Sequence, residues 1–107
     1  MTYSFVILRR AELDFHKIVQ WLKKRSPAGA ENWRFAFTEC LAEIVKDPFR
    51  HTKVAEAADL PFGVREALFS TPLGNTYRVV FLVEQTEVRV LRIRGPGQRD
   101  LRPRDVT

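Results

Sequence analysis

The sequence predicts an α+β fold: an N-terminal strand, a helical hairpin and then a three-stranded antiparallel meander, with both helices packed on one face of the sheet. Three observations support this β-α-α-β-β-β order. Apolar side chains recur at helical spacing in residues 10–25 and 27–47. Two strand-like runs then meet at a short turn between residues 77 and 94. The 107 residues, 45% of them apolar, can build one core but no second module, so residues 1–107 are expected to form a single domain.

The first strand and the first helix follow from residue type and spacing. Residues 3–8 (YSFVIL) are mostly aromatic or aliphatic, which predicts a short strand that pairs with the later ones. An amphipathic helix is expected over residues 10–25, because apolar side chains recur there at steps of three and four. Its stripe consists of Ala11, Phe15, Ile18, Val19 and Leu22. The cations Lys23, Lys24 and Arg25 complement the negative C-terminal end of that helix.

Ser26 and Pro27 are expected to start a second helix after almost no loop. The serine hydroxyl can cap the new helix, and a proline at the first helical position needs no amide donor. Its apolar stripe consists of Ala30, Trp33, Phe37, Leu41 and Ile44. The helix is expected to end at Asp47 and Pro48 after about 20 residues, or about 30 Å. So tight a connection predicts an antiparallel helical hairpin.

The second half of the chain is expected to contain three strands. Residues 48–62 contain two prolines and no sustained period, which predicts an extended connector. Residues 63–70 (GVREALFS) resume a strand, and the proline and glycine of residues 71–75 predict a turn. Residues 77–84 (YRVVFLVE) are nearly continuously apolar, which predicts a central strand covered on both faces.

The last strand, residues 88–94, combines apolar residues with Arg89, Arg92 and Arg94. Because unpaired arginines do not enter a core, this strand is expected to show one face to water or to an anionic partner. Gln85, Thr86 and Glu87 are expected to form the turn before it. Gly95-Pro96-Gly97 is expected to end it, because proline cannot donate to the ladder and glycine adopts backbone angles closed to other residues.

The net charge of +5, from 18 basic and 13 acidic side chains, is concentrated near the C-terminus. Residues 88–107 carry six basic and two acidic side chains, whereas residues 1–47 carry eight and six. A basic patch of this kind attracts phosphate backbones or an acidic protein partner. The alternative is a solvated strand face that serves solubility. The expected target-binding or nucleic-acid-binding residues are Arg92, Arg94, Arg102 and Arg104.

Several other kinds of chemistry lack the residues that they need. Cys40, the single cysteine, allows no intramolecular disulfide, and its place in a helical apolar pattern predicts a buried thiol in a reducing cytoplasm. His16 and His51 lie at no metal-ligand spacing from Cys40 or from each other, so neither a metal nor another cofactor is expected. Residues 5–8 are too short for a membrane span, and no signal peptide is expected.

What remains is a set of arginines on or beside adjacent strands. They are Arg65, Arg78, Arg92, Arg94, Arg99 and Arg102. Arginine binds phosphate through a planar fork and stabilises charge at a phosphoryl centre, but its pKa above about 12 makes it a poor proton carrier. Arginines without a base therefore indicate binding, or catalysis by electrostatics alone.

Arg78 begins the central strand and is expected to face the same side of the sheet as Val80. For phosphate chemistry it should project towards Arg99, so that two guanidinium groups meet one anion. The structural alternative is an ion pair with Glu66 or Glu84, because neighbouring strands commonly pair opposite charges.

Five features together resemble the RelE/ParE superfamily of bacterial type II toxins. They are the β-α-α-β-β-β order, SPAGAENW at residues 26–33, VREALF at 64–69, YRVVF at 77–81 and VLRIRGPGQRDL at 90–101. The resemblance spans nearly the whole chain. It implies a small cytoplasmic toxin that a cognate antitoxin holds inactive, without a small-molecule cofactor. Members of the family are either ribosome-dependent mRNA endonucleases of RelE type or DNA gyrase poisons of ParE type.

The resemblance also implies three candidate catalytic residues. Arg78 falls on the Tyr-Arg arginine that helps to bind and activate the scissile phosphate in RelE-like enzymes. Arg99 falls on the arginine after the last strand, and Arg65 lies near a basic position of the second strand. Two departures concern proton transfer: Gly95-Pro96-Gly97 fills the region where many of the nucleases have a histidine, and no tyrosine follows Tyr77. The sequence therefore favours a ParE-like gyrase poison, with a RelE-like endonuclease and a non-catalytic nucleic-acid-binding module as alternatives.

Overall fold

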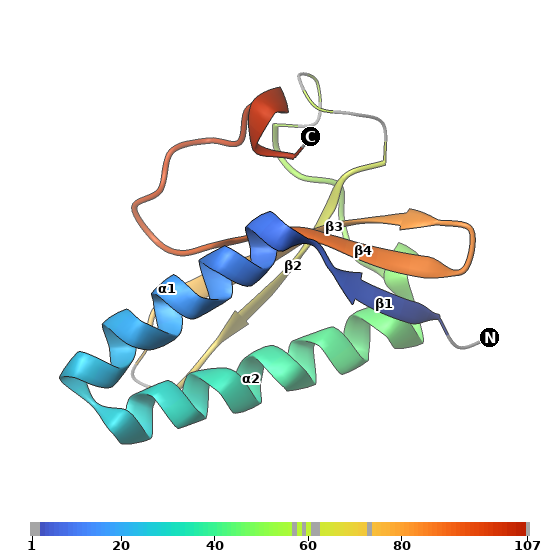
Figure 1. Ribbon diagram of the computed structural model, residues 1–107. Coiled ribbons are helices and arrows are strands. Elements are labelled where there is room, and N and C mark those ends of the chain that lie inside the picture. The colour runs from blue at the N-terminus through green and yellow to red at the C-terminus, as the bar shows by residue number, and fades with distance from the viewer. Residues whose placement is uncertain (1–2, 57, 59, 61–62, 73, 107) are drawn as a thin grey trace.

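The predicted order of elements is confirmed by the computed structural model, which describes residues 3–56, 58, 60, 63–72 and 74–106. The helices are α1 (Arg9–Arg25) and α2 (Pro27–Lys46), and the strands are β1 (Ser4–Ile7), β2 (Arg65–Ser70), β3 (Thr76–Glu84) and β4 (Glu87–Arg94). The short 3-10 helices η1 (Pro48–Arg50) and η3 (Pro103–Asp105) lie outside this framework. Figure 1 shows the two long helices together on one side of the sheet, as predicted.

The four strands form one mixed sheet in the order β1-β4-β3-β2. β2, β3 and β4 make the predicted antiparallel meander. β1 lies parallel to β4 at the other edge, where Ser4 pairs with Glu87 and Ile7 with Val90. β3 and β4 are therefore the central strands, while β1 and β2 leave one edge each for other segments to pair with.

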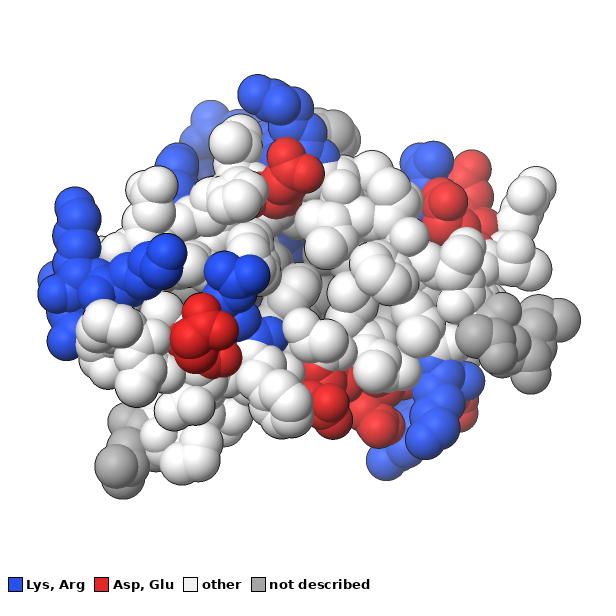
Figure 2. All heavy atoms as spheres, turned by 60° about the horizontal axis from the view of Figure 1, so that its bottom comes forward, with Lys and Arg blue, Asp and Glu red and all other residues white. Residues whose placement is uncertain are grey.

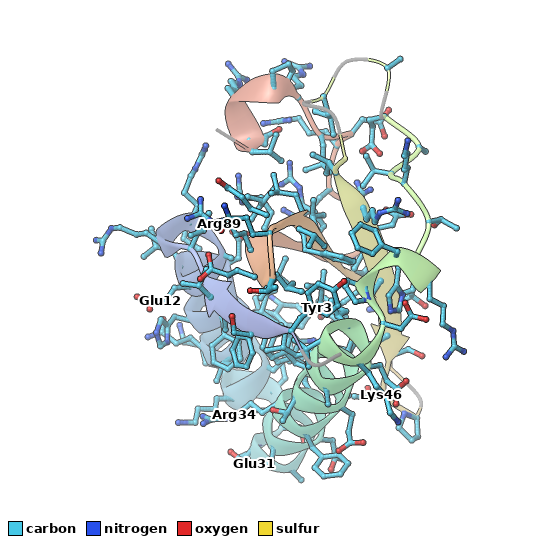
Figure 3. The ribbon with its side chains drawn as sticks, turned by 90° about the vertical axis from the view of Figure 1, so that its right-hand side faces the viewer. Tyr3, Glu12, Glu31, Arg34, Lys46 and Arg89 are labelled. Atoms are coloured by element: carbon cyan, nitrogen blue, oxygen red, sulfur yellow. The ribbon has the colours of Figure 1, made fainter. Side chains whose placement is uncertain are left out.

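The helical hairpin is held by the predicted cap and the predicted apolar stripes. The hydroxyl oxygen of Ser26 accepts a hydrogen bond from the backbone N–H of Gly29 at 3.0 Å, and Pro27 occupies the first position of α2. Ser26 alone separates the two helices. In Figure 3, Glu31 of α2 points away from the sheet, whereas Arg34 extends towards α1, where its guanidinium group lies over the ring of Phe15.

The main core lies between the helices and the sheet. Trp33 is its centre: its ring stacks on Phe37 with ring centroids 5.7 Å apart and meets the edge of Tyr77 at 5.6 Å. Cys40 is buried in the same cluster, as predicted, and burial raises the pKa of its thiol to about 11.

A second core covers the opposite face of the sheet. It consists of Val54, Leu60, Val64, Val80, Leu91, Leu101 and Val106. The connector and residues 95–106, which we call the C-terminal segment, thus close over the face that the helices leave free (Figure 1). β3 is covered on both sides, as predicted. The face of β4 that is expected to meet water or an anionic partner is instead covered by the C-terminal segment, which leaves Arg94 only 5% exposed.

Two backbone irregularities precede the buried part of the C-terminal segment: a β-bulge within β4 and the glycine-proline stop after it. A β-bulge between Val80 and Phe81 shifts the β3–β4 register, so that Leu91 and Arg92 do not follow the simple alternation of the strand. β4 ends at Arg94, as predicted from the glycines and proline that follow, and Gly97 adopts a φ of 80° that favours glycine. The predicted extended connector begins with η1 and lies partly outside the described residues.

Candidate functional site

Arginines from β3 and β4 share the sheet face that lies opposite the helices. Arg78 pairs with Arg94 and Val80 pairs with Arg92 across the two strands. Because directly opposed residues lie on the same face, Arg78, Arg92 and Arg94 all project towards the second core, on the side of Val80 as predicted. The sheet therefore concentrates three guanidinium groups on a face that the connector and the C-terminal segment cover.

Arg78 is held by two carboxylates. Its Nη2 donates to Glu56 Oε2 at 2.8 Å, and its Nη1 donates to Glu66 Oε1 at 2.8 Å and to Glu56 Oε1 at 3.2 Å. Glu56 Oε2 also accepts from the backbone N–H of Leu101 at 2.7 Å. The hydrogen bonds from Arg78 lower the pKa of the Glu56 carboxyl to about 2. The predicted structural ion pair with Glu66 is thus present, whereas Glu84 contacts Arg89 instead.

The second acidic centre, Asp105, is surrounded by three arginines, and we call this group the Asp105 cluster. Arg99 donates to both carboxylate oxygens, Nη1 to Oδ2 at 2.7 Å and Nη2 to Oδ1 at 2.9 Å. Arg94 Nη2 lies 3.3 Å from Oδ2, and Arg92 Nη1 lies 3.6 Å from Oδ1. The backbone N–H of Arg102 also donates to Oδ2, at 2.8 Å. Asp105 itself is 3% exposed, and the hydrogen bonds from Arg99 hold its pKa well below the usual range.

Arg94 is the least satisfied member of the Asp105 cluster. Its Nε and Nη2 atoms are buried without a hydrogen-bond acceptor in the described part of the chain. The 3.3 Å contact with Asp105 is an ion pair without hydrogen-bond geometry. Burial and the neighbouring Arg92 lower the pKa of Arg94.

Arg65 is separated from the other candidate catalytic residues. It pairs with Phe81, whose side chain belongs to the main core, so Arg65 starts on the helix side of the sheet. Its Nη1 donates to the backbone oxygen of His51 at 2.7 Å, and its guanidinium group lies over the ring of Phe49. The structure therefore does not bring Arg65 and Arg78 to one site.

Arg78 and Arg99 do not share an anion either. Arg78 contacts Glu56 and Glu66, whereas Arg99 contacts Asp105. Arg102 and Arg104, which the sequence predicts as target-binding residues, are exposed on the C-terminal segment. Of the predicted binding arginines, these two reach solvent, while Arg92 and Arg94 are engaged by carboxylates beneath the segment.

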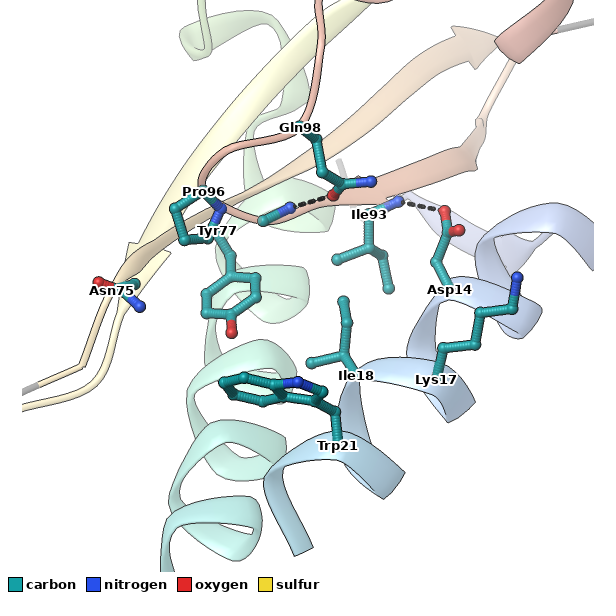
Figure 4. Close-up of a pocket in the computed structure, with 10 residues that line it drawn as sticks. Asp14, Lys17, Ile18, Trp21, Asn75, Tyr77, Ile93, Pro96 and Gln98 are labelled. Carbon is teal, nitrogen blue, oxygen red and sulfur yellow. Dashed lines mark hydrogen bonds between the residues drawn. The ribbon is translucent and has the colours of Figure 1, made fainter. Parts of the chain in front are cut away.

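A groove of about 380 Å³ lies on the helix side of the sheet, between α1 and the start of the C-terminal segment. Figure 4 shows Trp21 and Tyr77 on its walls, with Asp14 and Gln98 at its rim. Asp14 already accepts hydrogen bonds from Arg92 and from the backbone N–H of Ile93. The groove thus offers aromatic and aliphatic walls, together with the ammonium group of Lys17.

A second groove, of about 640 Å³, lies between α2 and β2. Glu39, Glu43, Arg50 and His51 line it. Burial, more than the nearby charge of Arg50, lowers the pKa of His51, so its imidazole is neutral at physiological pH. The backbone oxygen of His51 accepts from Arg65, while its imidazole meets the ring of Phe81 edge-on, with ring centroids 5.9 Å apart.

The residues that sequence reasoning missed are the acids that bind the arginines. Glu56 and Asp105 organise the two arginine centres, and Asp14 forms a two-point ion pair with Arg92. No local pattern marks these three acids. Within the described ranges, no group of three or more histidine, cysteine, aspartate or glutamate side chains is arranged to hold a metal ion. No described helix is long and apolar enough to cross a membrane.

Solved structures, but neither family models nor curated sequences, contain chains that are similar to this one. No protein-family model matches the sequence. No curated protein is significantly similar to it. A chain in the crystal structure of the toxin-antitoxin complex RelBE2 from Mycobacterium tuberculosis aligns with 89% of this chain and 99% of its own length, at 19% sequence identity and a TM-score of 0.48.

Proposed function

We propose that this chain is a toxin of the RelE/ParE superfamily, the partner of a cognate antitoxin, and that it inhibits growth in the cytoplasm by binding its target rather than by cutting RNA. The sequence motifs and the β-α-α-β-β-β order support the superfamily. The engagement of the candidate catalytic arginines supports a binding mechanism. The target that this reading favours is DNA gyrase, as in the ParE branch of the superfamily.

The observation that carries the binding mechanism is the state of Arg78 and Arg99. Each guanidinium group already donates two or more hydrogen bonds to carboxylates of its own chain. No histidine or tyrosine side chain in the described residues hydrogen-bonds to either arginine. A phosphoryl-transfer site needs cationic groups that are free to bind a phosphate, and a group that moves a proton. The guanidinium groups of Arg78 and Arg99 are occupied by carboxylates, and no such proton-transfer side chain is hydrogen-bonded to them in the described residues.

The antitoxin has both apolar surface and open sheet edges to bind. Large apolar side chains that are 44–69% exposed are Phe5, Leu13, Trp21, Phe35, Phe49 and Leu68. Figure 2 shows a broad uncharged area on one face, with lysines and arginines gathered at its left end, where α1 ends. Residues 52–54 cover the start of β2 through backbone hydrogen bonds, but no described backbone group pairs with the outer edge of residues 67–70. An acidic or amphipathic peptide that adds a strand there and covers the apolar side chains fits this surface.

Two purified assays run side by side test the target. In the first, the chain is added to DNA gyrase and supercoiled product and trapped cleaved DNA are measured. In the second, it is added to translating ribosomes and mRNA cleavage is mapped. We expect inhibition of gyrase and no cleavage of mRNA. Cleavage that requires ribosomes, with gyrase unaffected, would replace this proposal with the RelE-like one.

The RelE-like endonuclease is the second candidate, and His51 favours it. His51 brings a neutral imidazole to the α2–β2 groove, where that ring packs against Phe81, and its backbone oxygen accepts a hydrogen bond from Arg65. His51→Gln separates the two mechanisms in the ribosome assay. The substitution should abolish cleavage if His51 moves a proton, and it should leave gyrase inhibition unchanged if the chain acts by binding.

The antitoxin is tested by co-expression with the product of the neighbouring gene. We expect the two proteins to co-purify and growth to be restored. Leu68→Asp, which places a charge on the open part of β2, should weaken the complex, whereas Glu31→Gln on the outer face of α2 should not. A chain that inhibits growth but binds no neighbouring product would contradict the paired system.

A further inference from the structure

The outer side of β1 is an open edge of the sheet. Ser4 and Leu8 donate their backbone N–H groups towards β4 in hydrogen bonds of 3.0 Å. Because backbone groups alternate along a strand, the N–H and C=O groups of Phe5 and Ile7 point away from β4. No other described segment pairs with them, and Figure 1 shows β1 at the edge of the sheet beside the N-terminus.

The sequence of β1 lacks the residues that usually keep edge strands from pairing. Residues 4–7 (SFVI) contain no charge, proline or glycine. Phe5 is 50% exposed. It pairs with Val88 of the main core, so its ring lies on the helix side of the sheet. The edge therefore combines unpaired backbone groups with an exposed aromatic ring.

The edge is complementary to a second copy of itself in antiparallel orientation. Phe5 and Ile7 stand one residue on either side of Val6, so a two-fold axis at Val6 places Phe5 of one copy opposite Ile7 of the other. Each such pair exchanges both backbone hydrogen bonds, which satisfies the outward N–H and C=O groups of Phe5 and Ile7. On the helix side, the ring of Phe5 then packs on the side chain of Ile7 in the second copy.

The charges beside β1 are also complementary about this axis. Glu84 and Glu87 share Arg89 next to the start of β1, which leaves an excess of negative charge there. Arg9 and Arg10 follow the end of β1, are exposed, and form no ion pair with a described carboxylate. Antiparallel pairing brings the start of one β1 beside the end of the other, so the opposite charges face each other on both sides of the axis.

We propose that the chain forms a two-fold dimer in which β1 pairs antiparallel with β1 of a second copy and joins the two four-stranded sheets into one. The pairing uses the open edge of both β1 strands, so assembly stops at the dimer. The outer edges of β2 lie at the two ends of the joined sheet, where the proposed antitoxin strand can still add. The inference goes beyond the proposed function and does not require that the chain inhibit growth.

The first experiment measures the dimer by sedimentation equilibrium of the purified chain. An edge of four residues buries less than the roughly 800 Å² per partner of a standard interface, so we expect a Kd on the order of 10 μM. Phe5→Lys places a charge on the open edge and should raise this Kd at least about tenfold. Phe35→Lys makes the same change at an exposed site of α2 and should leave the Kd unchanged.

A disulfide experiment tests the register. At the two-fold axis the two Val6 residues form a pair without hydrogen bonds, with Cα atoms about 4.5 Å apart, which a disulfide can bridge. Under oxidised glutathione, Val6→Cys should therefore give a covalent dimer on a non-reducing gel. Ser4→Cys, on the same face of β1, should not, because its two thiols would lie more than about 10 Å apart. The buried Cys40 is common to both variants.

The dimer and its register must both be found. A chain that stays monomeric up to about 200 μM overturns the proposal, because this is well above the expected Kd. A dimer that folded Phe5→Lys does not weaken, or that Ser4→Cys crosslinks as fast as Val6→Cys, also overturns it, since another surface would then join the copies. If circular dichroism shows that Phe5→Lys is unfolded, the two cysteine variants decide. A monomer in which Phe5→Lys weakens binding of the neighbouring gene product would assign this edge to the antitoxin instead.

Discussion

Arg92 on β4 and Asp14 on α1 are 78 positions apart and form a two-point ion pair, with Nε to Oδ2 at 2.8 Å and Nη2 to Oδ1 at 2.9 Å. The same Oδ2 accepts from the backbone N–H of Ile93 at 3.0 Å. Both side chains are 13% exposed. The pair therefore ties the first helix to the last strand at a place where water only partly screens the charges.

Removing one partner of this pair should destabilise the protein. Among the described residues, Asp14→Ala leaves Arg92 with its long contacts to the carboxylate and the backbone oxygen of Asp105, and it removes the acceptor of Ile93. We expect a loss of about 2 to 3 kcal/mol in the free energy of unfolding, measured by urea denaturation. Glu12→Ala, an exposed acid in the first turn of the same helix, is the control and should cost at most about 0.5 kcal/mol. Equal losses in the two variants would show that the ion pair contributes nothing to the free energy of unfolding.

The helix cap gives a second, independent prediction. Ser26→Ala removes the acceptor for Gly29 N–H at the start of α2 and should cost about 1 kcal/mol. Ser26→Asp keeps an acceptor oxygen at the cap and should retain most of the stability. Urea denaturation of the three proteins measures both effects, and a stable Ser26→Ala protein would contradict the assignment of Ser26 as the cap.

The order and bounds of the elements could be predicted because their signals are local. The spacing of apolar residues, the Ser26-Pro27 start and the Gly95-Pro96-Gly97 stop each operate within a few residues, and the structure confirms all three. Glu66 could also be predicted as a partner of Arg78, because the two lie on adjacent strands.

The acids of the arginine centres could not be predicted, because nothing in a sequence says which distant carboxylate folds against which arginine. Glu56 lies 22 positions before Arg78, on a connector without a regular period. The covering of β4 was missed for a similar reason. In the C-terminal segment, Leu101 and Val106 are isolated apolar residues among charged ones, so no period marks the segment as part of a core.

Stability should depend on pH through Glu56. Its pKa is lowered from 4.5 to about 2 in the folded protein, so its contribution is fully present above pH 4.5 and is lost as the pH falls towards 2. The difference in unfolding free energy between the unchanged protein and Glu56→Gln should therefore shrink between pH 5 and pH 2, by at most about 3 kcal/mol and by less where water screens the pair. Urea denaturation at several pH values measures it. Glu31→Gln, an exposed acid on α2, should show no such convergence.

The thiol of Cys40 should react slowly. Because burial raises its pKa to about 11, almost no thiolate is present at pH 8, and the thiol is also covered. We expect alkylation by iodoacetamide at pH 8 to be at least about a hundredfold slower in the native protein than in concentrated urea. Mass spectrometry follows the reaction. Similar rates in both conditions would place the thiol at the surface.

Substitution of Arg78 distinguishes a binding mechanism from a catalytic one, provided that the substitution leaves the protein folded. The double variant Arg78→Gln with Glu56→Gln replaces the ion pair by two neutral amides and keeps an acceptor for Leu101 N–H. Exchanging both members of a buried ion pair costs far less than removing one, and the Glu66 carboxylate that loses its cation is 19% exposed to water, so we expect stability within about 1 to 2 kcal/mol of the unchanged protein. If the chain acts by binding gyrase, the folded double variant should still inhibit growth when compared at equal soluble amounts. If Arg78 activates a scissile phosphate, inhibition should disappear although the fold and antitoxin binding persist.

The single variant Arg78→Gln, which leaves Glu56 and Glu66 without their cation, should be the least stable of the set. A loss of inhibition in that variant alone would therefore not assign Arg78 to a catalytic site.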